Sequence, residues 1–203
     1  MVQNPERRTV LADAAIEVLA RDGARGLTFR AVDGQAGVPA GTASNYFASR
    51  NALLAQAAER IHVRLRPDDA TVAEMLRTRP APSPGVLERE LTAMYHRLAG
   101  QQTDYLALLE LRLEAIRRPE VRASLTATMR ANLERNIAAH RESGLPGDDV
   151  DVVLMYLALS WLIIENLTLP GVLDGYDADR LITALTELVA ARDHPRGHVR
   201  VEP

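Results

Sequence analysis

Residues 28–50 decide how the rest of the chain is organised: Thr-Phe-Arg-Ala-Val-Asp-Gly-Gln-Ala-Gly-Val-Pro-Ala-Gly-Thr-Ala-Ser-Asn-Tyr-Phe-Ala-Ser-Arg. Their pattern predicts two short helices joined by a tight turn. Thr28 has the side chain of a helix N-cap, and Val32 and Ala36 give the apolar i, i+4 spacing of a helix. Gly37 ends the first helix because glycine accepts left-handed backbone, and Pro39 opens the second, where a missing N–H costs nothing. Two short helices with a glycine turn are what a helix-turn-helix reader of DNA requires.

Longer helices are predicted on both sides of this motif. Asn4 followed by Pro5 has the pattern of an N-cap and a first helical residue, so a helix begins there and ends near Gly23. Its apolar stripe supplies the floor on which the short helices pack, with Phe29, Val32 and Phe47 as their contacts. The stripe is Val10, Leu11, Ala14, Ala15, Val18 and Leu19. Ser49 is the N-cap of a long helix that connects the motif to the rest of the chain.

Three pieces of this region resemble the helix-turn-helix of the TetR family of bacterial transcriptional regulators. They are Gly37–Thr42, Asn45–Phe47 and Ser49–Leu54, in the family's order. The resemblance implies an all-α protein with an N-terminal head of three helices and a C-terminal helical bundle for ligand binding and dimerisation. It places the head at residues 1–48, a connecting helix at 49–66 and the ligand-binding and dimerisation domain at 67–192. Residues 193–203 are polar and are expected to form a flexible tail.

Composition and charge agree with a globular helical protein that has a DNA-binding end. Hydrophobic residues make up 47% of the 203 residues and aromatic residues only 4%, which favours helix over sheet. The chain has no cysteine, so disulfides, thiolate chemistry and zinc sites with cysteine ligands are excluded. The net charge is −3, yet residues 1–66 hold nine arginines and six acids, a net charge of +3. A basic first third on an acidic body suits a DNA-binding head on a regulatory domain.

The resemblance also assigns DNA contacts. Thr28, Tyr46 and Arg50 correspond to positions that contact phosphate, and such contacts position a head without reading sequence. For Tyr46 the alternative is a half-buried structural aromatic. The base-facing positions are Arg30, Ala40, Thr42 and Ser44, with Asn45 at the edge.

At two of these positions the chain departs from the family's usual residues. The family often has Tyr at position 44 and Lys or Gln at position 40, where this chain has Ser44 and Ala40. Small side chains touch thymine methyls or make one hydrogen bond, but they give no bidentate readout. Arg30 is therefore the candidate for a guanine contact, and its alternatives are a phosphate contact or a solvated side chain. Asp33 is a further departure, since a small apolar residue is usual there. It either changes how its helix packs or faces solvent.

Beyond residue 66 the pattern predicts a proline-rich linker over 66–85, with a short helical piece at 72–76. Helical segments follow at 86–100, 103–117, 119–143, 148–169 and 178–192. Segment 148–169 is apolar almost all round, so we expect it to be buried on every side, by the domain core and by a second subunit. The resemblance implies a homodimer that pairs segments 148–169 and 178–192.

The body is expected to enclose an apolar pocket for an unknown small-molecule effector. The candidate lining residues are Met94, Tyr95, Leu98, Tyr105, Leu109, Leu113, Met129, Leu133, Trp161 and Glu165. The alternative for the Met and Leu residues is plain core. Glu165 and Asn166 interrupt an apolar run, and they either orient the ligand or pair across the dimer interface.

Catalytic motifs are not found, and we expect no enzyme activity, no cofactor and no metal site. The histidines are scattered, and a proline separates His194 from His198. The N-terminus lacks an apolar signal region, so a cytoplasmic protein without a membrane segment is expected. The predicted function is a ligand-responsive homodimeric regulator, a repressor released from a palindromic DNA operator by a small molecule, with activation as the other sense of regulation. The alternatives are a helical interaction module or a small all-α enzyme without sequence-specific DNA binding.

Overall fold

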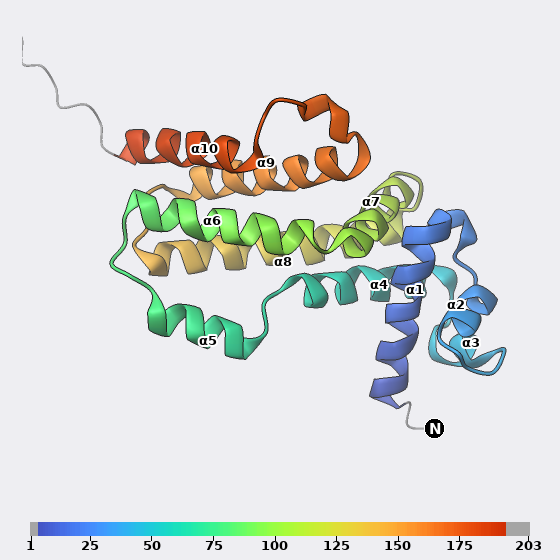
Figure 1. The fold of residues 1–203 in the computed structure, drawn as a ribbon. Helices are drawn as coiled ribbons and strands as arrows, with labels where there is room; N and C mark the ends of the chain where they lie inside the picture. Colours follow the sequence, from blue (N-terminus) through green and yellow to red (C-terminus); the bar gives the residue numbers. More distant parts are fainter. Residues whose placement is uncertain (1–3, 194–203) are drawn as a thin grey trace, which may run out of the picture. The chain divides into compact units, whose positions relative to one another are not determined.

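The computed structural model describes residues 4–193, and every regular element in that range is a helix (Figure 1). The predicted all-α class is confirmed. The described residues form two compact units, the first from residues 4–72 together with 101–132, and the second from 73–100 and 133–193. In the first unit α7 and the start of α8 pack with the N-terminal helices, and the predicted division at residues 48 and 66 stays a prediction.

The first unit holds the helix-turn-helix and the helices that support it. In this unit α7 packs along α1 and α4, and α2 packs against α1 and α3. Its elements are α1 (Pro5–Gly26), α2 (Phe29–Gln35), α3 (Thr42–Tyr46), α4 (Arg50–Leu65), α7 (Gln102–Arg117) and the first part of α8 (Pro119–Ser143). The predicted apolar stripe of α1 is buried apart from Val10, which is 44% exposed. Val32 and Phe47 are buried in the same core, and Phe29 is half-buried against it.

The predicted N-caps are confirmed. The Asn4 side chain accepts from the amide of Glu6 at 2.9 Å, and the Thr28 hydroxyl accepts from the amide of Ala31 at 3.1 Å. Ser49 accepts in the same way at the start of α4. Each cap supplies an acceptor for an amide that has no partner within its own helix, which is why these helices begin where they do.

Gly23 interrupts α1 near the predicted end of the first helix. Its φ of 69° lies in the left-handed region, and helical backbone resumes for one short turn before the chain enters α2. The carboxylate of Glu110 on α7 accepts from the amide of Ala24 at 2.8 Å, directly after this kink. The hydrogen bond to Ala24 therefore connects the kink in α1 to α7.

The predicted start of the second motif helix at Pro39 is wrong. α3 begins at Thr42, and its N-cap Gly41 has a left-handed φ of 88°. The carbonyl of Pro39 accepts from the amide of Thr42 at 3.1 Å, so Pro39 lies in the turn. Proline fits the first position of a helix, but a left-handed residue two positions later ends any helix that it would begin.

The second unit is built on two long helices and the last helix that the structure describes. α10 packs against α6 and α9, and α6 packs against α9. The elements are α6 (Pro84–Ala99), the rest of α8, α9 (Asp149–Thr168), the short 3₁₀ helix η1 (Pro170–Leu173) and α10 (Ala178–Asp193), while α5 (Asp69–Thr78) crosses the boundary between the units. α5 is longer than the predicted 72–76 piece, whereas the five predicted body helices agree with the structure to within about two residues. The predicted tail lies almost wholly outside the described residues, as do His194 and His198.

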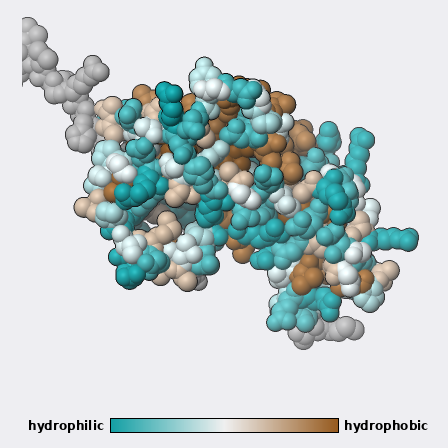
Figure 2. Space-filling model, in the orientation of Figure 1, coloured by the Kyte–Doolittle hydropathy of each residue, from teal (hydrophilic) through white to brown (hydrophobic). Residues whose placement is uncertain are grey.

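Within this chain α9 is buried on one side, and its predicted cover by a second subunit stays a prediction. Asp151, Val152, Met155, Leu159 and Ile163 are its buried residues. A second face of the helix is open, because α6 and α10 cover only one side, and Figure 2 shows apolar surface over the C-terminal part of α9 and the loop after it. The open face carries Val150, Leu154, Leu157 and Trp161, which are 56, 44, 55 and 64% exposed. By length and composition α9 would also suffice to cross a membrane, but one such helix is weak evidence for a membrane span.

His62 is a buried histidine of the first unit. Its ring is 7% exposed, with Nδ1 2.8 Å from the carbonyl oxygen of Ala58 and Nε2 2.8 Å from the sulfur of Met129. A carbonyl only accepts, so Nδ1 carries the proton of the neutral ring. Burial lowers the pKa of His62 below its usual value of 6.5, and the hydrogen bond to Ala58 only partly opposes this.

Because the folded protein binds this proton less readily than the unfolded chain, stability is full above the unfolded pKa and is lost as pH falls through it toward the folded pKa. We therefore expect the unfolding midpoint of the wild type to fall more steeply between pH 7 and pH 5 than that of a His62→Gln variant. Urea unfolding followed by circular dichroism at each pH checks this. Parallel pH profiles for the two proteins would contradict it.

Candidate nucleic-acid interface

α3, the helix placed to read DNA, has only five residues. A helix this short is unstable by itself, because its nucleation is unfavourable and few of its amides and carbonyls find partners within it. Its position must therefore be fixed by groups from other elements. Two charged side chains provide this, one at each end.

Asp33 of α2 holds the N-terminal end. Its carboxylate accepts from the amide of Gly41 and from the amide of Ala43, each at 2.7 Å, and its side chain is almost wholly buried. A carboxylate at this end also matches the positive end of the helix dipole. Of the two interpretations of Asp33, the packing role is supported and the solvent-facing one is wrong.

Arg8 of α1 holds the C-terminal end. Its Nη1 donates to the carbonyl of Tyr46, the last residue of α3, at 2.9 Å, and its Nε donates to Gln56 of α4 at 2.7 Å. The guanidinium lies over the ring of Phe47, 4.7 Å from its centroid. Sequence reasoning missed Arg8, because nothing in the residues around it indicates a partner 38 positions away. Together Asp33 and Arg8 fix α3 at both ends.

The predicted base-facing residues surround α3. Arg30, Ala40, Ser44 and Asn45 are exposed, and Thr42 is half-buried. Thr42 donates its hydroxyl to the carbonyl of Pro39 at 2.6 Å, and Ser44 donates to the carbonyl of Gly41 at 2.8 Å. With their protons used in this way, both hydroxyls keep oxygen lone pairs that can accept from a base amine.

Arg30 has the freest side chain of the set. It is exposed, and within residues 4–193 it makes no hydrogen bond or ion pair. Its five donors are therefore available for a base edge or a phosphate.

The three predicted phosphate contacts differ in their surroundings. Thr28 is exposed, and Tyr46 is half-buried. The guanidinium of Arg50 is turned toward the protein, where its Nε donates to the carbonyl of Leu27 at 3.0 Å and its Nη2 donates to the carbonyl of Ala24. As the structure stands, Arg50 attaches the start of α4 to the end of α1, and its phosphate contact stays a prediction.

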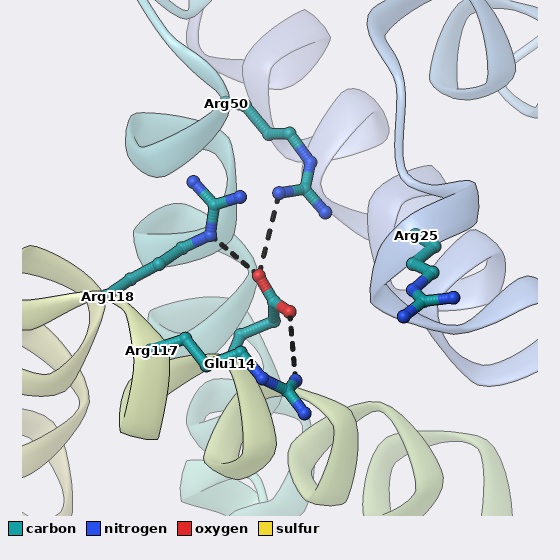
Figure 3. A pocket seen from close by; sticks show the side chains of 5 residues that line it. All are labelled: Arg25, Arg50, Glu114, Arg117 and Arg118. Carbon is teal, nitrogen blue, oxygen red and sulfur yellow. Dashed lines mark hydrogen bonds and ion pairs between the residues drawn. The ribbon is translucent and has the colours of Figure 1, made fainter.

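Next to Arg50 the first unit has an open cleft of about 400 Å³. Figure 3 shows its lining, Arg25 from the end of α1, Arg50 from the start of α4, and Glu114, Arg117 and Arg118 from the end of α7. The Glu114 carboxylate lies among the guanidinium groups and accepts from Arg118 Nε at 2.7 Å. This hydrogen bond and the charges of the neighbouring arginines hold the pKa of Glu114 below its usual value.

None of the ten residues predicted to line a ligand pocket borders this cleft. Tyr105, Leu109, Leu113 and Met129 lie in the first unit, and Met94, Tyr95, Leu98, Leu133, Trp161 and Glu165 lie in the second. Their role stays a prediction.

The exposures of these ten residues span a wide range. Trp161 and Leu113 are 64 and 44% exposed, while Tyr95 and Tyr105 are buried. Asn166 donates to the Tyr95 hydroxyl at 2.9 Å, which gives this polar residue a partner within its own unit. Within residues 4–193, no three His, Asp or Glu side chains lie together in a way that could hold a metal ion.

Comparisons with known proteins cover most of the chain. A family model described as "Bacterial regulatory proteins, tetR family" matches residues 11–57, and one described as "Tetracyclin repressor-like, C-terminal domain" matches residues 82–192. No curated protein matches the chain.

Solved structures of regulators have the same fold. The crystal structure of a TetR-family transcriptional regulator from Rhodococcus sp. superposes with a TM-score of 0.71 at 24% identity, over 92% of this chain and 100% of that one. A member of the TetR family from Streptomyces coelicolor A3 gives a TM-score of 0.62 at 26% identity, over 91 and 99%. The multidrug binding protein EbrR, complexed with imidazole, gives 0.62 at 25% identity, over 97 and 99%.

Proposed function

Because the chain belongs to the TetR family of DNA-binding bacterial transcriptional regulators, we propose that it is a homodimeric repressor that binds a palindromic operator and is released from it by a small molecule. The observation that carries the DNA-reading part is the attachment of α3 at both ends by Asp33 and Arg8. A reading helix must present its side chains in a fixed register to the base edges, and this attachment supplies that rigidity.

On this proposal Arg30 contacts a guanine, and Ser44 and Thr42 accept from base amines or touch thymine methyls. Thr28 and Tyr46 contact phosphates on either side and set the register. Ala40 lets the backbone approach the bases closely, and Asn45 borders the contact. The assignment of Arg30 is supported by its exposure and its lack of a partner among the described residues.

Two heads on one palindrome require a dimer, and the open face of α9 supports one. Val150, Leu154, Leu157 and Trp161 follow each other at steps of four, three and four residues, so they form one stripe along the helix. On α10, Leu181 and Leu188 are also exposed, at 37 and 66%. Apolar stripes of this kind on a water-exposed surface mark an interaction site. We propose that they pair with the same helices of a second copy.

For a ligand to release the protein from DNA, its binding must change the position of the DNA-binding helices. Within the first unit α7 packs along both α1 and α4, and Glu110 and Glu114 of α7 contact the end of α1 and the start of α4. A ligand that binds the two arrangements of α7 unequally would therefore change the operator affinity. The ligand-bound EbrR structures are consistent with a small molecule as effector. The ten predicted pocket residues remain our proposal for its site.

The location follows from this function. A regulator of this kind acts where the chromosome lies, so we propose that the protein is cytoplasmic. Regulators of this family are transcription factors and not enzymes, and we propose no reaction for this chain.

Fluorescence anisotropy tests the DNA-reading part. The protein is titrated against overlapping duplexes from its own promoter region at near-physiological salt. We expect tight binding to one duplex, and a loss of about 5- to 150-fold for Arg30→Ala, because a bidentate guanine contact contributes about 1–3 kcal/mol. Tyr46→Phe removes only a hydroxyl and should weaken binding to all duplexes alike.

The matched control is Arg77→Ala on α5, a similar change on a surface arginine whose side chain is 72% exposed. It should bind like the wild type. Weak, salt-sensitive binding of wild type and variants to every duplex would contradict sequence-specific reading and would favour a helical interaction module or an enzyme.

A further inference from the structure

The cleft in the first unit has an excess of positive charge that the protein does not neutralise. Four guanidinium groups, from Arg25, Arg50, Arg117 and Arg118, surround the one carboxylate of Glu114 (Figure 3). The formal charge of the lining is therefore +3. A single carboxylate offers about four lone-pair sites, whereas four guanidinium groups carry about twenty N–H donors.

Arg50 and Arg118 each donate two hydrogen bonds to the protein. Arg50 donates to two carbonyls, and Arg118 donates to Glu114 and, at 3.0 Å, to Asn51. These two side chains are also partly buried, so they form a fixed wall of the cleft.

Arg25 and Arg117 have their donors free. Arg117 approaches Glu114 only to 3.6 Å and its side chain is 71% exposed. Arg25 is exposed and makes no hydrogen bond or ion pair within residues 4–193. In Figure 3 the guanidinium groups of Arg25 and Arg117 lie on the side of Glu114 that is away from Arg118.

We propose that this cleft is a binding site for a phosphate group, held between Arg25 and Arg117 with Arg50 behind it. A guanidinium presents a planar fork of donors that matches phosphate oxygens, and a group with two negative charges neutralises most of the +3 lining. Glu114 acts as the internal counter-ion that keeps the arginines in place when no phosphate is bound. The inference goes beyond the proposed function, since it assigns a ligand to Arg25 of α1 and Arg117 of α7, which the predicted DNA contacts do not include.

The phosphate group could come from a small phosphorylated compound or from the DNA backbone. The cleft joins the end of α1, the start of α4 and the end of α7. A phosphate group from either source would therefore contact both α7 and the helices that flank the helix-turn-helix. The test has one arm for each source, and the first arm contains no DNA.

In the first arm, thermal unfolding is followed while inorganic pyrophosphate is added to the full-length protein, with sodium chloride at equal ionic strength as the reference. We expect a saturable rise of about 3–5 °C in the unfolding midpoint of the wild type. Arg117→Ala should lose most of this rise. Arg77→Ala is the matched control, because its side chain is equally exposed (72 against 71%) and also faces an acid three residues away.

Glu114→Gln separates a binding site from a merely structural cluster. If the cluster only holds the fold together, the variant is less stable and its response to pyrophosphate is unchanged. If it is a phosphate site, removal of the competing carboxylate should tighten pyrophosphate binding about tenfold, whatever happens to the starting midpoint.

In the second arm, binding to a duplex of unrelated sequence is measured over a range of salt. If the DNA backbone fills the site, Arg117→Ala lowers the slope of log affinity against log salt by about 0.9, and Arg77→Ala does not. A pyrophosphate response without a slope change assigns the site to a small compound. No response in either arm overturns the proposal, and this holds whether or not a specific operator is found.

Discussion

An Asp33→Ala variant is expected to lose about 3–5 kcal/mol of unfolding free energy, since each hydrogen bond to a charged group contributes about 1.5–3 kcal/mol. The change removes both acceptors from the N-terminal end of α3, those for the amides of Gly41 and Ala43. Ala43 is wholly buried, so water cannot replace the lost partner there. The expected loss is large because two amides, one of them buried, depend on one carboxylate.

Two further variants make this result specific. Asp33→Asn keeps one acceptor oxygen but turns an NH₂ group toward the second amide, so it should fall between the wild type and Asp33→Ala. Asp22→Ala removes a carboxylate that, among residues 4–193, pairs with the neighbouring exposed Arg21 alone, and it should leave the unfolding midpoint unchanged. Urea unfolding followed by circular dichroism measures all three. A loss below about 1 kcal/mol for Asp33→Ala would mean that the turn before α3 finds other acceptors.

The same variant connects stability to DNA reading. With its N-terminal end free, α3 would keep the hydrogen bond from Arg8 at its other end and the packing of Ala43 in the core. Operator affinity of Asp33→Ala should therefore fall even at temperatures at which the variant is still folded. An unchanged affinity in the folded variant would show that α3 keeps its position without the cap.

The parts of the fold that were predicted correctly depend on neighbouring residues. The caps at Asn4, Thr28 and Ser49 involve amides two or three positions away, so the sequence contains both partners within one turn. The breaks between the body helices are equally local, since glycine and proline act on their own backbone. The resemblance to the family motif added the prediction that these helices together form a three-helix head.

The parts that were missed depend on residues far apart in the chain. Arg8 and Tyr46 are separated by 38 positions, and Arg50 and Glu114 by more. Nothing in a local pattern states that an arginine of α1 will meet the end of α3. The start of α3 was misplaced for a related reason, because Gly41 and its partner Asp33 end the turn later than Pro39 alone suggests.

The apolar pattern of α9 predicted burial, but it did not predict which face is covered within the chain. Its apolar residues run all round the helix, so they indicated burial without showing which face is covered by which partner. The structure separates the two faces, one buried in the second unit and one open. That separation makes a sharp prediction about the dimer.

Leu157→Glu is expected to convert the protein from a dimer to a monomer, with the dissociation constant raised at least about 100-fold. Leu157 lies in the middle of the exposed stripe on α9 and is 55% exposed. In a two-fold interface one substitution places two carboxylates in an apolar contact, and burying an unpaired charge is costly. Sedimentation velocity should show the wild type at twice the chain mass of 22.3 kDa and the variant at 22.3 kDa.

Val63→Glu is the matched control, because Val63 on α4 is also 55% exposed and also an apolar side chain, but it lies outside the α9 stripe. It should remain dimeric. If both variants dissociate, added charge and not the α9 face is responsible, and if neither does, the subunits pair elsewhere. The result also bears on DNA reading. A Leu157→Glu monomer keeps Asp33, Arg8 and α3 intact, so it should bind an isolated half-site as the wild type does while losing the gain that two linked heads have on a palindrome.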